Sequence, residues 1–159
     1  MTQERTNFLY VTFIRTTPEK VFEALTRPEL TRRYWGHDNV SEWKVGAPWA
    51  HVRDNPERTV NIVGEVVECA PPRRLVVSWT GASSVDDPVS YSRVTYELEP
   101  YDGMVRLTVS HEDLLVGSAM EQGVRRGWPI VLSSLKSFLE TGESIDIFAK
   151  PLASLAGAA

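Results

Sequence analysis

Apolar and polar residues alternate with a period of two along most of the chain, and this pattern predicts strands rather than helices. A Pro-Pro pair at 71–72 and an Asp-Gly pair at 102–103 separate some of the alternating runs, and Asp-Gly is typical of a tight hairpin. The predicted strands cover residues 7–15, 41–44, 49–53, 59–68, 73–80, 92–99 and 104–111. A loop is expected over 81–91.

One stretch near the C-terminal end has helical spacing instead. Its apolar stripe consists of Trp128, Val131, Leu132, Leu135, Phe138 and Leu139. Pro129 is expected near the start of this helix, where a missing N–H costs nothing, and Gly142 just past its end. Residues 112–126 are expected to be less regular.

Two short helices are predicted after the first strand. Thr17 offers an N-cap oxygen and Pro18 a first helical position. The second helix begins at Pro28 and ends before Gly36, but its cap position holds Arg27, which is a poor capping residue.

Within the later strands, parity separates a buried face from a solvated one. The residues expected to face the long helix are Leu75, Val77, Trp79, Val94, Tyr96, Leu98, Val105, Leu107, Val109 and His111. Antiparallel sheets allow one face to be wet. The sequence therefore predicts an α+β fold in which a long C-terminal helix lies on an antiparallel sheet.

Length and charge narrow the class of protein. The chain has 159 residues and a formal net charge of -4, which argues against a nucleic-acid partner because such proteins present a basic face. We expect one domain over 1–142, followed by an extension over 143–159 that is partly disordered or packed on a neighbour. We expect no membrane span or signal peptide, and the lone Cys69 fits a cytoplasmic protein.

Several short motifs in fixed order carry a resemblance to a known family. They are Thr16–Thr26, Tyr34-Trp35-Gly36, Trp43–Gly46, Gly64-Glu65-Val66, Pro71–Leu75, Leu107–His111 and Gly127–Gly142. With these motifs the chain resembles the START/Bet v 1-like (SRPBCC) superfamily, and more narrowly the bacterial branch of the activator of heat-shock protein 90 ATPase homologue family. Arg27 departs from the pattern, because the family usually carries a capping Asp there.

The resemblance implies a helix-grip fold, in which a curved antiparallel sheet wraps around the C-terminal helix and leaves a cavity between them. Members of the superfamily bind lipids, sterols and hormones or cyclise polyketides. The resemblance therefore implies a small hydrophobic or amphipathic ligand. Homodimerisation is an open alternative to a monomer, because the apolar side chains after Gly142 can pack on a neighbour or fold back on their own sheet.

The expected ligand-binding residues are those that parity and spacing place near this cavity. They are Trp35, Trp49, His51, Arg53, Val77, Trp79, Tyr96, Val109, His111, Trp128, Leu132 and Leu135. The tryptophans also fit a purely structural role in the core, and a histidine on an apolar face is more often a hydrogen-bonded core residue than a catalyst. Trp43 is expected to be structural.

Two other functions stay open at this point. A cyclase-, aromatase- or hydrolase-like enzyme would use His111, His51 or Arg53, since histidine titrates near neutrality and arginine can hold a carboxylate. A co-chaperone-like role would use the surface rather than the cavity. We expect no catalytic residue and no cofactor. We also expect no metal, because His37, His51 and His111 lack ligand spacing.

Overall fold

The computed structural model describes residues 3–145, and within them seven strands form one antiparallel sheet in the order β1-β7-β6-β5-β4-β3-β2. The strands are β1 (Arg5–Ile14), β2 (His37–Ser41), β3 (Pro48–Arg53), β4 (Val60–Ala70), β5 (Arg74–Gly81), β6 (Ser92–Tyr101) and β7 (Met104–Leu115). The helices are α1 (Pro18–Thr26), α2 (Pro28–Trp35) and α3 (Ala119–Thr141). The expected extension falls mostly in residues 146–159, which lie outside the described residues.

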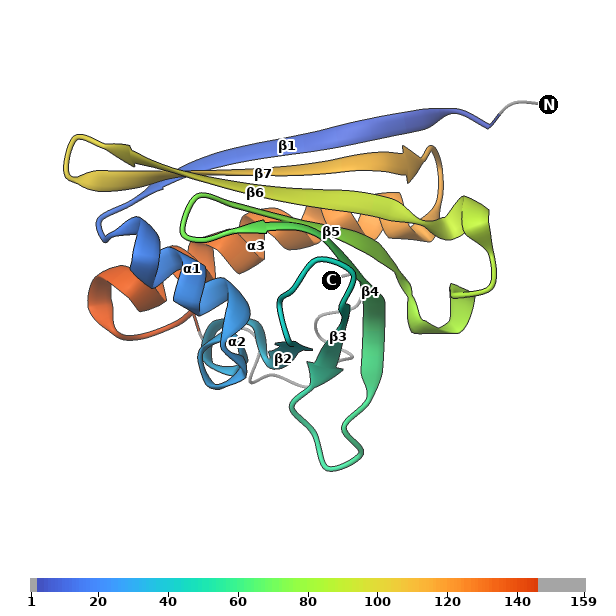
Figure 1. The fold of residues 1–159 in the computed structure, drawn as a ribbon, viewed down its shortest axis with the longest axis horizontal. Coiled ribbons are helices and arrows are strands. Elements are labelled where there is room, and N and C mark those ends of the chain that lie inside the picture. The colour runs from blue at the N-terminus through green and yellow to red at the C-terminus, as the bar shows by residue number, and fades with distance from the viewer. Residues whose placement is uncertain (1–2, 146–159) are drawn as a thin grey trace.

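The predicted α+β helix-grip architecture is confirmed. The sheet bends around α3, and α1 and α2 lie at one end of it (Figure 1). Every residue that parity predicted on the inner face of β5, β6 and β7 is buried. The buried stripe of α3 packs on that face through Trp128, Val131, Leu132, Leu135 and Phe138. No helix in residues 3–145 is long and apolar enough to cross a membrane.

The start of α3 corrects the sequence prediction. The helix begins at Ala119, so Pro129 lies inside it rather than near its start. Ser118 caps the first turn by accepting a hydrogen bond from Glu121 N–H at 3.1 Å, and the Glu121 carboxylate accepts one from Gly117 N–H at 2.8 Å. This is a variant of the capping box, and the Ser-x-x-Glu pattern at 118–121 was the available signal.

Two other boundaries differ from the prediction. The strand expected at 41–44 occupies His37–Ser41, and Trp43 has a positive φ of 54°, which no strand residue adopts. The expected loop at 81–91 contains two short 3₁₀ turns, η1 (Ala82–Ser84) and η2 (Pro88–Ser90). Ser90 Oγ holds these turns together by donating to the backbone carbonyl oxygens of Ser84 and Asp87.

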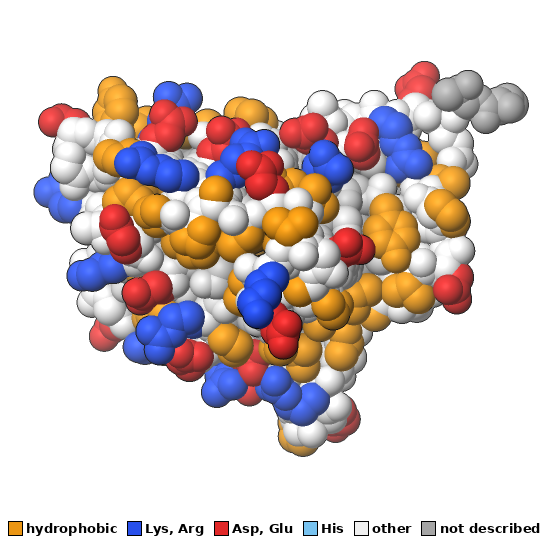
Figure 2. All heavy atoms as spheres, viewed as in Figure 1, with side chains coloured by type: hydrophobic (Ala, Val, Ile, Leu, Met, Phe, Trp, Pro, Cys, Tyr) orange, Lys and Arg blue, Asp and Glu red, His pale blue; other side chains and the backbone are white. Residues whose placement is uncertain are grey.

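The surface carries charges of both signs. Basic and acidic side chains are interspersed over the face drawn in Figure 2, and no region of that face has a single sign. Several of these side chains form ion pairs along or between elements, such as Lys136 with Glu140 at 2.7 Å on α3. The face drawn there gives a polyanion no extended basic track to bind.

Candidate functional site: a tryptophan-lined cavity

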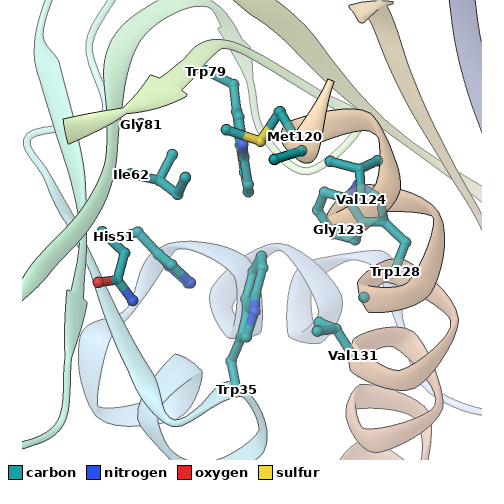
Figure 3. Close-up of a pocket in the computed structure, with 13 residues that line it drawn as sticks. Trp35, His51, Ile62, Trp79, Gly81, Met120, Gly123, Val124, Trp128 and Val131 are labelled. Atoms are coloured by element: carbon teal, nitrogen blue, oxygen red, sulfur yellow. The ribbon is translucent and has the colours of Figure 1, made fainter. Parts of the chain in front are cut away.

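A cavity of about 370 Å³ lies between the sheet and the first half of α3 (Figure 3). Most of its walls are apolar or aromatic side chains. The sheet side and α2 contribute Trp35, His51, Asn61, Ile62, Trp79 and Gly81, and α3 contributes Ala119, Met120, Gly123, Val124, Gly127, Trp128 and Val131. The two glycines of α3, Gly123 and Gly127, matter because a side chain at either position would stand in the cavity wall. An added Cβ on Gly123 meets no atom within 4 Å.

Four of the twelve residues predicted from the sequence border this cavity. They are Trp35, His51, Trp79 and Trp128. The structure places the others outside its lining. Val77, Tyr96, Val109, Leu132 and Leu135 are buried in the core between sheet and helix.

Trp49 is held away from the cavity by its own hydrogen bond. Its indole Nε1–H donates to Ser78 O at 2.8 Å, across β4. Gly64 makes this crossing feasible, since a Cβ there would collide with the Ser78 carbonyl and with the Trp49 indole. The glycine in the motif Gly64-Glu65-Val66 therefore has a packing role.

Arg53 lies opposite His37 in the β2–β3 register, at the outer end of β3. Its side chain is only partly buried and does not border the cavity. Indeed, no Lys or Arg of the described chain is among the residues that line it. The cavity wall is therefore uncharged when its histidine is neutral.

His111 is fully buried and both of its ring nitrogens are engaged. Trp128 Nε1–H donates to His111 Nδ1 at 3.1 Å, so Nδ1 must be unprotonated and Nε2 carries the hydrogen. Nε2–H then donates to Ser92 Oγ at 2.8 Å, and Ser92 Oγ–H donates to Trp79 O at 3.2 Å. Burial lowers the pKa of His111 to about 3, which keeps the ring neutral.

His51 is also buried, but only one of its nitrogens has a protein partner. Its Nδ1 lies 2.6 Å from Asn39 Oδ1, and Nε2 has no partner among residues 3–145. The ring reaches from β3 into the space between Trp35 and Trp79 (Figure 3), with ring centroids 4.6 Å and 6.3 Å away. Burial, aided by the neighbouring His37, holds the pKa of His51 well below its ordinary value.

The sequence did not predict the roles of His37 and Asn61. His37 packs on His51, and Asn61 holds the His37 ring in place. The His37 ring stacks on His51 with centroids 3.9 Å apart, and its Nδ1–H donates to Trp35 O at 3.0 Å. Asn61 Nδ2–H donates to His37 Nε2 at 2.9 Å. Burial lowers the pKa of His37, and the nearby Arg53 charge acts in the same direction.

A bulge in β4 brings Asn61 to the cavity. His51 pairs with Ile62 and Val52 pairs with Val60, so Asn61 is an extra residue between them. Bulges re-aim side chains, and here Asn61 and the adjacent Ile62 both border the cavity, which strict alternation would forbid. Alternation was the only guide in the sequence, and for that reason Asn61 was not found.

Two further polar atoms at the cavity residues have no protein partner. The indole N–H groups of Trp35 and Trp79 are buried without an acceptor in the described chain. Nearly all buried donors in native proteins have a partner, so each such group calls for an explanation.

No group of three or more His, Cys, Asp or Glu side chains in residues 3–145 is placed to hold a metal ion.

Two other hollows differ in character from this cavity. One, of about 290 Å³, lies beneath η1 and η2 and shares Gly81, Ala119 and Met120 with it, so the two meet at the start of α3. The other is a wide groove on β2, β3 and β4, which includes Val40, Glu42 and Glu65. None of the unpaired buried side-chain nitrogens of the described chain belongs to that groove.

Comparison with known proteins decides the family. The model of the family described as activator of Hsp90 ATPase homolog 1-like protein matches residues 15–140. The chain belongs to this family. The resemblance drawn from the sequence motifs is thereby confirmed. Among curated proteins, none gives a significant match.

Solved structures from bacteria share the fold of this family member. The Aha1 dimer from Colwellia psychrerythraea is 22% identical with a TM-score of 0.71, covering 87% of this chain and 99% of that one. CalU16 from Micromonospora echinospora is 21% identical with a TM-score of 0.66, covering 89% and 88%. A protein from Mesorhizobium loti is 24% identical with a TM-score of 0.71, covering 84% and 96%. At these identities the likeness concerns the fold alone.

Proposed function

We propose that this protein binds a small hydrophobic or amphipathic molecule in the cavity between the sheet and α3. The observation that carries the proposal is a cavity of about 370 Å³ with aromatic and aliphatic walls and a few polar atoms. Ligand sites in proteins have this size and composition, with apolar walls for affinity and few polar groups for orientation.

The unpaired polar atoms support the same proposal. A buried donor without a partner costs roughly 1–3 kcal/mol, and the indole N–H groups of Trp35 and Trp79 are two such donors. Both indoles border the cavity, and so does His51, whose Nε2 is unpaired. A ligand that supplies partners there would recover part of this cost, and the recovered energy would contribute to affinity.

The enzyme alternative based on His111 or Arg53 finds little support in the geometry. A general base needs a ring nitrogen that can reach the substrate, and both nitrogens of His111 hold protein groups. Arg53 lies outside the cavity lining. His51, the third candidate, keeps a free Nε2, but among the described residues no second titratable side chain lines the cavity beside it. We therefore place a binding role first.

Filling the cavity from α3 tests the proposal directly. Gly123→Leu would project a side chain into open space, since an added Cβ there meets nothing within 4 Å. Titration with the uncharged apolar fluorophore N-phenyl-1-naphthylamine is expected to give saturable binding to the wild-type protein. The variant should bind at least about tenfold more weakly, because the leucine occupies the volume of the probe.

Gln122→Leu is the matched control, because residue 122 is the exposed neighbour of Gly123 on the same helix. It adds an equal side chain on the solvent side and should leave probe binding unchanged. Circular dichroism would confirm that both variants are folded. Equal binding by wild type and Gly123→Leu would place the probe elsewhere and contradict the proposal.

Homodimerisation is a separate proposal with its own support. The Colwellia relative is described as a dimer. In the present chain β1 is an edge strand of the sheet, and its Leu9 and Phe13 are exposed. Light scattering coupled to size exclusion would measure the mass, and Leu9→Lys should shift a dimer toward monomer. A monomeric mass for the wild type at all concentrations would contradict the proposal.

A further inference from the structure

The hydrogen-bond partners of His51 fix where its proton sits. Asn39 lies directly opposite His51 in the β2–β3 register. Asn39 Nδ2–H donates to Leu25 O at 3.3 Å, which turns Oδ1 of the same amide toward the histidine. Because an amide oxygen only accepts, His51 Nδ1 must carry the hydrogen of the 2.6 Å contact. In the neutral ring, Nε2 is therefore an acceptor with a free lone pair.

The side-chain amide of Asn61 is also left with an unused acceptor. His37 Nδ1–H donates to the Trp35 carbonyl, so His37 Nε2 is unprotonated and accepts from Asn61 Nδ2–H. This turns the Asn61 oxygen away from His37, and that oxygen has no partner among residues 3–145. Both polar residues of the cavity wall, His51 and Asn61, thus keep an unused acceptor.

The cavity wall offers unused acceptors and, on the two unpaired indoles, unused donors, but among the described residues it holds no cation. The missing cation selects against an anionic ligand. A carboxylate brings only lone pairs, and no Lys or Arg of the described chain borders the cavity to neutralise it. Burying such an unpaired charge is strongly unfavourable. An ether or ketone can accept from an indole N–H but leaves His51 Nε2 without a donor. A hydroxyl can donate through its hydrogen and can accept through its oxygen from an indole N–H, such as those of Trp35 and Trp79.

We propose that the ligand is an apolar molecule bearing a neutral hydroxyl group, an alcohol or a phenol, which donates its hydrogen to His51 Nε2. The apolar body lies along Trp79, Trp128 and the α3 side chains Val124 and Val131. The proposal rests on the proposed function, since it names the class of molecule that enters the same cavity. His51 acts here as a specificity-determining residue, and Asn39 and His37 are positioning residues.

Three matched probes separate this inference from the proposed function. They are 2-naphthol, its methyl ether 2-methoxynaphthalene, and 2-naphthoate, each measured by isothermal titration calorimetry at pH 7.5. The naphthol should bind at least about fivefold tighter than the ether, as expected for one net hydrogen bond. The naphthoate should bind most weakly of the three.

A second measurement reports on the atom itself. With ¹⁵N-labelled histidine, the unprotonated Nε2 of His51 should change its chemical shift on adding 2-naphthol, while the His111 nitrogens should not, because they keep their protein partners. His51→Phe should remove the preference for naphthol over the ether. Because this variant leaves Asn39 Oδ1 unpaired, the chemical-shift measurement on wild type stands if the variant fails to fold.

Each outcome has a distinct meaning. If none of the three probes binds, and the fluorophore titration also fails, the proposed function is overturned. If the ether or the naphthoate binds as tightly as the naphthol or tighter, the hydroxyl inference is overturned while the proposed function stands. An unchanged His51 shift with bound naphthol would also overturn the inference.

Discussion

His111 and His51 both contact the same tryptophan cluster. Comparing them shows how a histidine that stabilises the fold differs from one that is free to bind a ligand. Both are almost completely buried, with 0% and 3% of their surface exposed. Both contact Trp79, at centroid distances of 5.2 Å and 6.3 Å. His111 uses both ring nitrogens on protein groups, whereas His51 uses one. The two histidines are thus alike in burial and residue type, and they differ only in how many of their ring nitrogens bind protein groups.

The largest expected effect is the loss of His111. His111→Ala would leave Trp128 N–H unpaired and open a cavity, so the free energy of unfolding should fall by about 4 kcal/mol. Urea denaturation measures this. Ser92→Ala, which removes one link of the same chain, should cost less. A loss below about 1 kcal/mol for His111→Ala would contradict a supporting role.

Acid should destabilise the protein through the same residue. The folded pKa of His111, about 3, lies below its ordinary value of 6.5, so between these values the unfolded chain binds the proton more readily. Stability present above pH 6.5 is therefore lost as the pH falls, at up to about 1.4 kcal/mol per pH unit for this group. Unfolding free energies of wild type at pH 7 and pH 5 measure the slope.

The variant His111→Gln sharpens that test. It should be less stable than wild type at pH 7, but its stability should fall less steeply toward pH 5, because one buried titrating group has been removed. His37 and His51, whose pKa values burial also lowers, would contribute to the remaining slope. Equal slopes in the two proteins would show that His111 is not the group responsible.

The tryptophans should also differ in how much their side-chain N–H groups stabilise the fold. Trp128→Phe removes an N–H that donates to His111, whereas Trp35→Phe removes an N–H without an acceptor. Both changes delete the same atoms, so the first should cost about 1–2 kcal/mol more than the second. Parallel thermal or urea unfolding compares them. A larger loss for Trp35→Phe would mean that its N–H has a stabilising partner in solution.

The smallest expected effect concerns Gly123, in the wall of the cavity. Gly123→Ala should raise the free energy of unfolding by about 0.5–1 kcal/mol, because alanine favours the helix and its methyl meets nothing in the cavity. Differential scanning calorimetry would detect the shift. A decrease would indicate that the added methyl group meets a neighbouring atom, and would contradict open space beside Gly123.

The sequence predicted the fold well because the fold depends on periodic burial. Alternation in β5, β6 and β7 and the stripe of α3 identified nearly every inner-face residue, and turn residues such as Gly36 and Asp102-Gly103 adopt the positive φ values that end the elements. The start of α3 was misplaced because Gly123 and Gly127 interrupt its apolar stripe. Those same glycines leave space for the cavity.

The site was predicted only in part, because it depends on departures from periodicity. Trp35, Trp79, Trp128 and His51 follow from parity and spacing, and they border the cavity. Whether a buried side chain has spare hydrogen-bonding capacity depends on contacts between residues far apart in the chain, such as Asn39 with Leu25. No local pattern contains that information. Whether the twelve predicted residues bind a ligand stays a prediction.

The extra residue in β4 has a consequence beyond this molecule. Asn61 enters the cavity only because the strand is one residue longer than its partner at that point. A family member without that insertion would keep the helix-grip fold but would lose the Asn61 amide from the cavity wall. The His37 ring that stacks on His51 would also lose its hydrogen-bond donor.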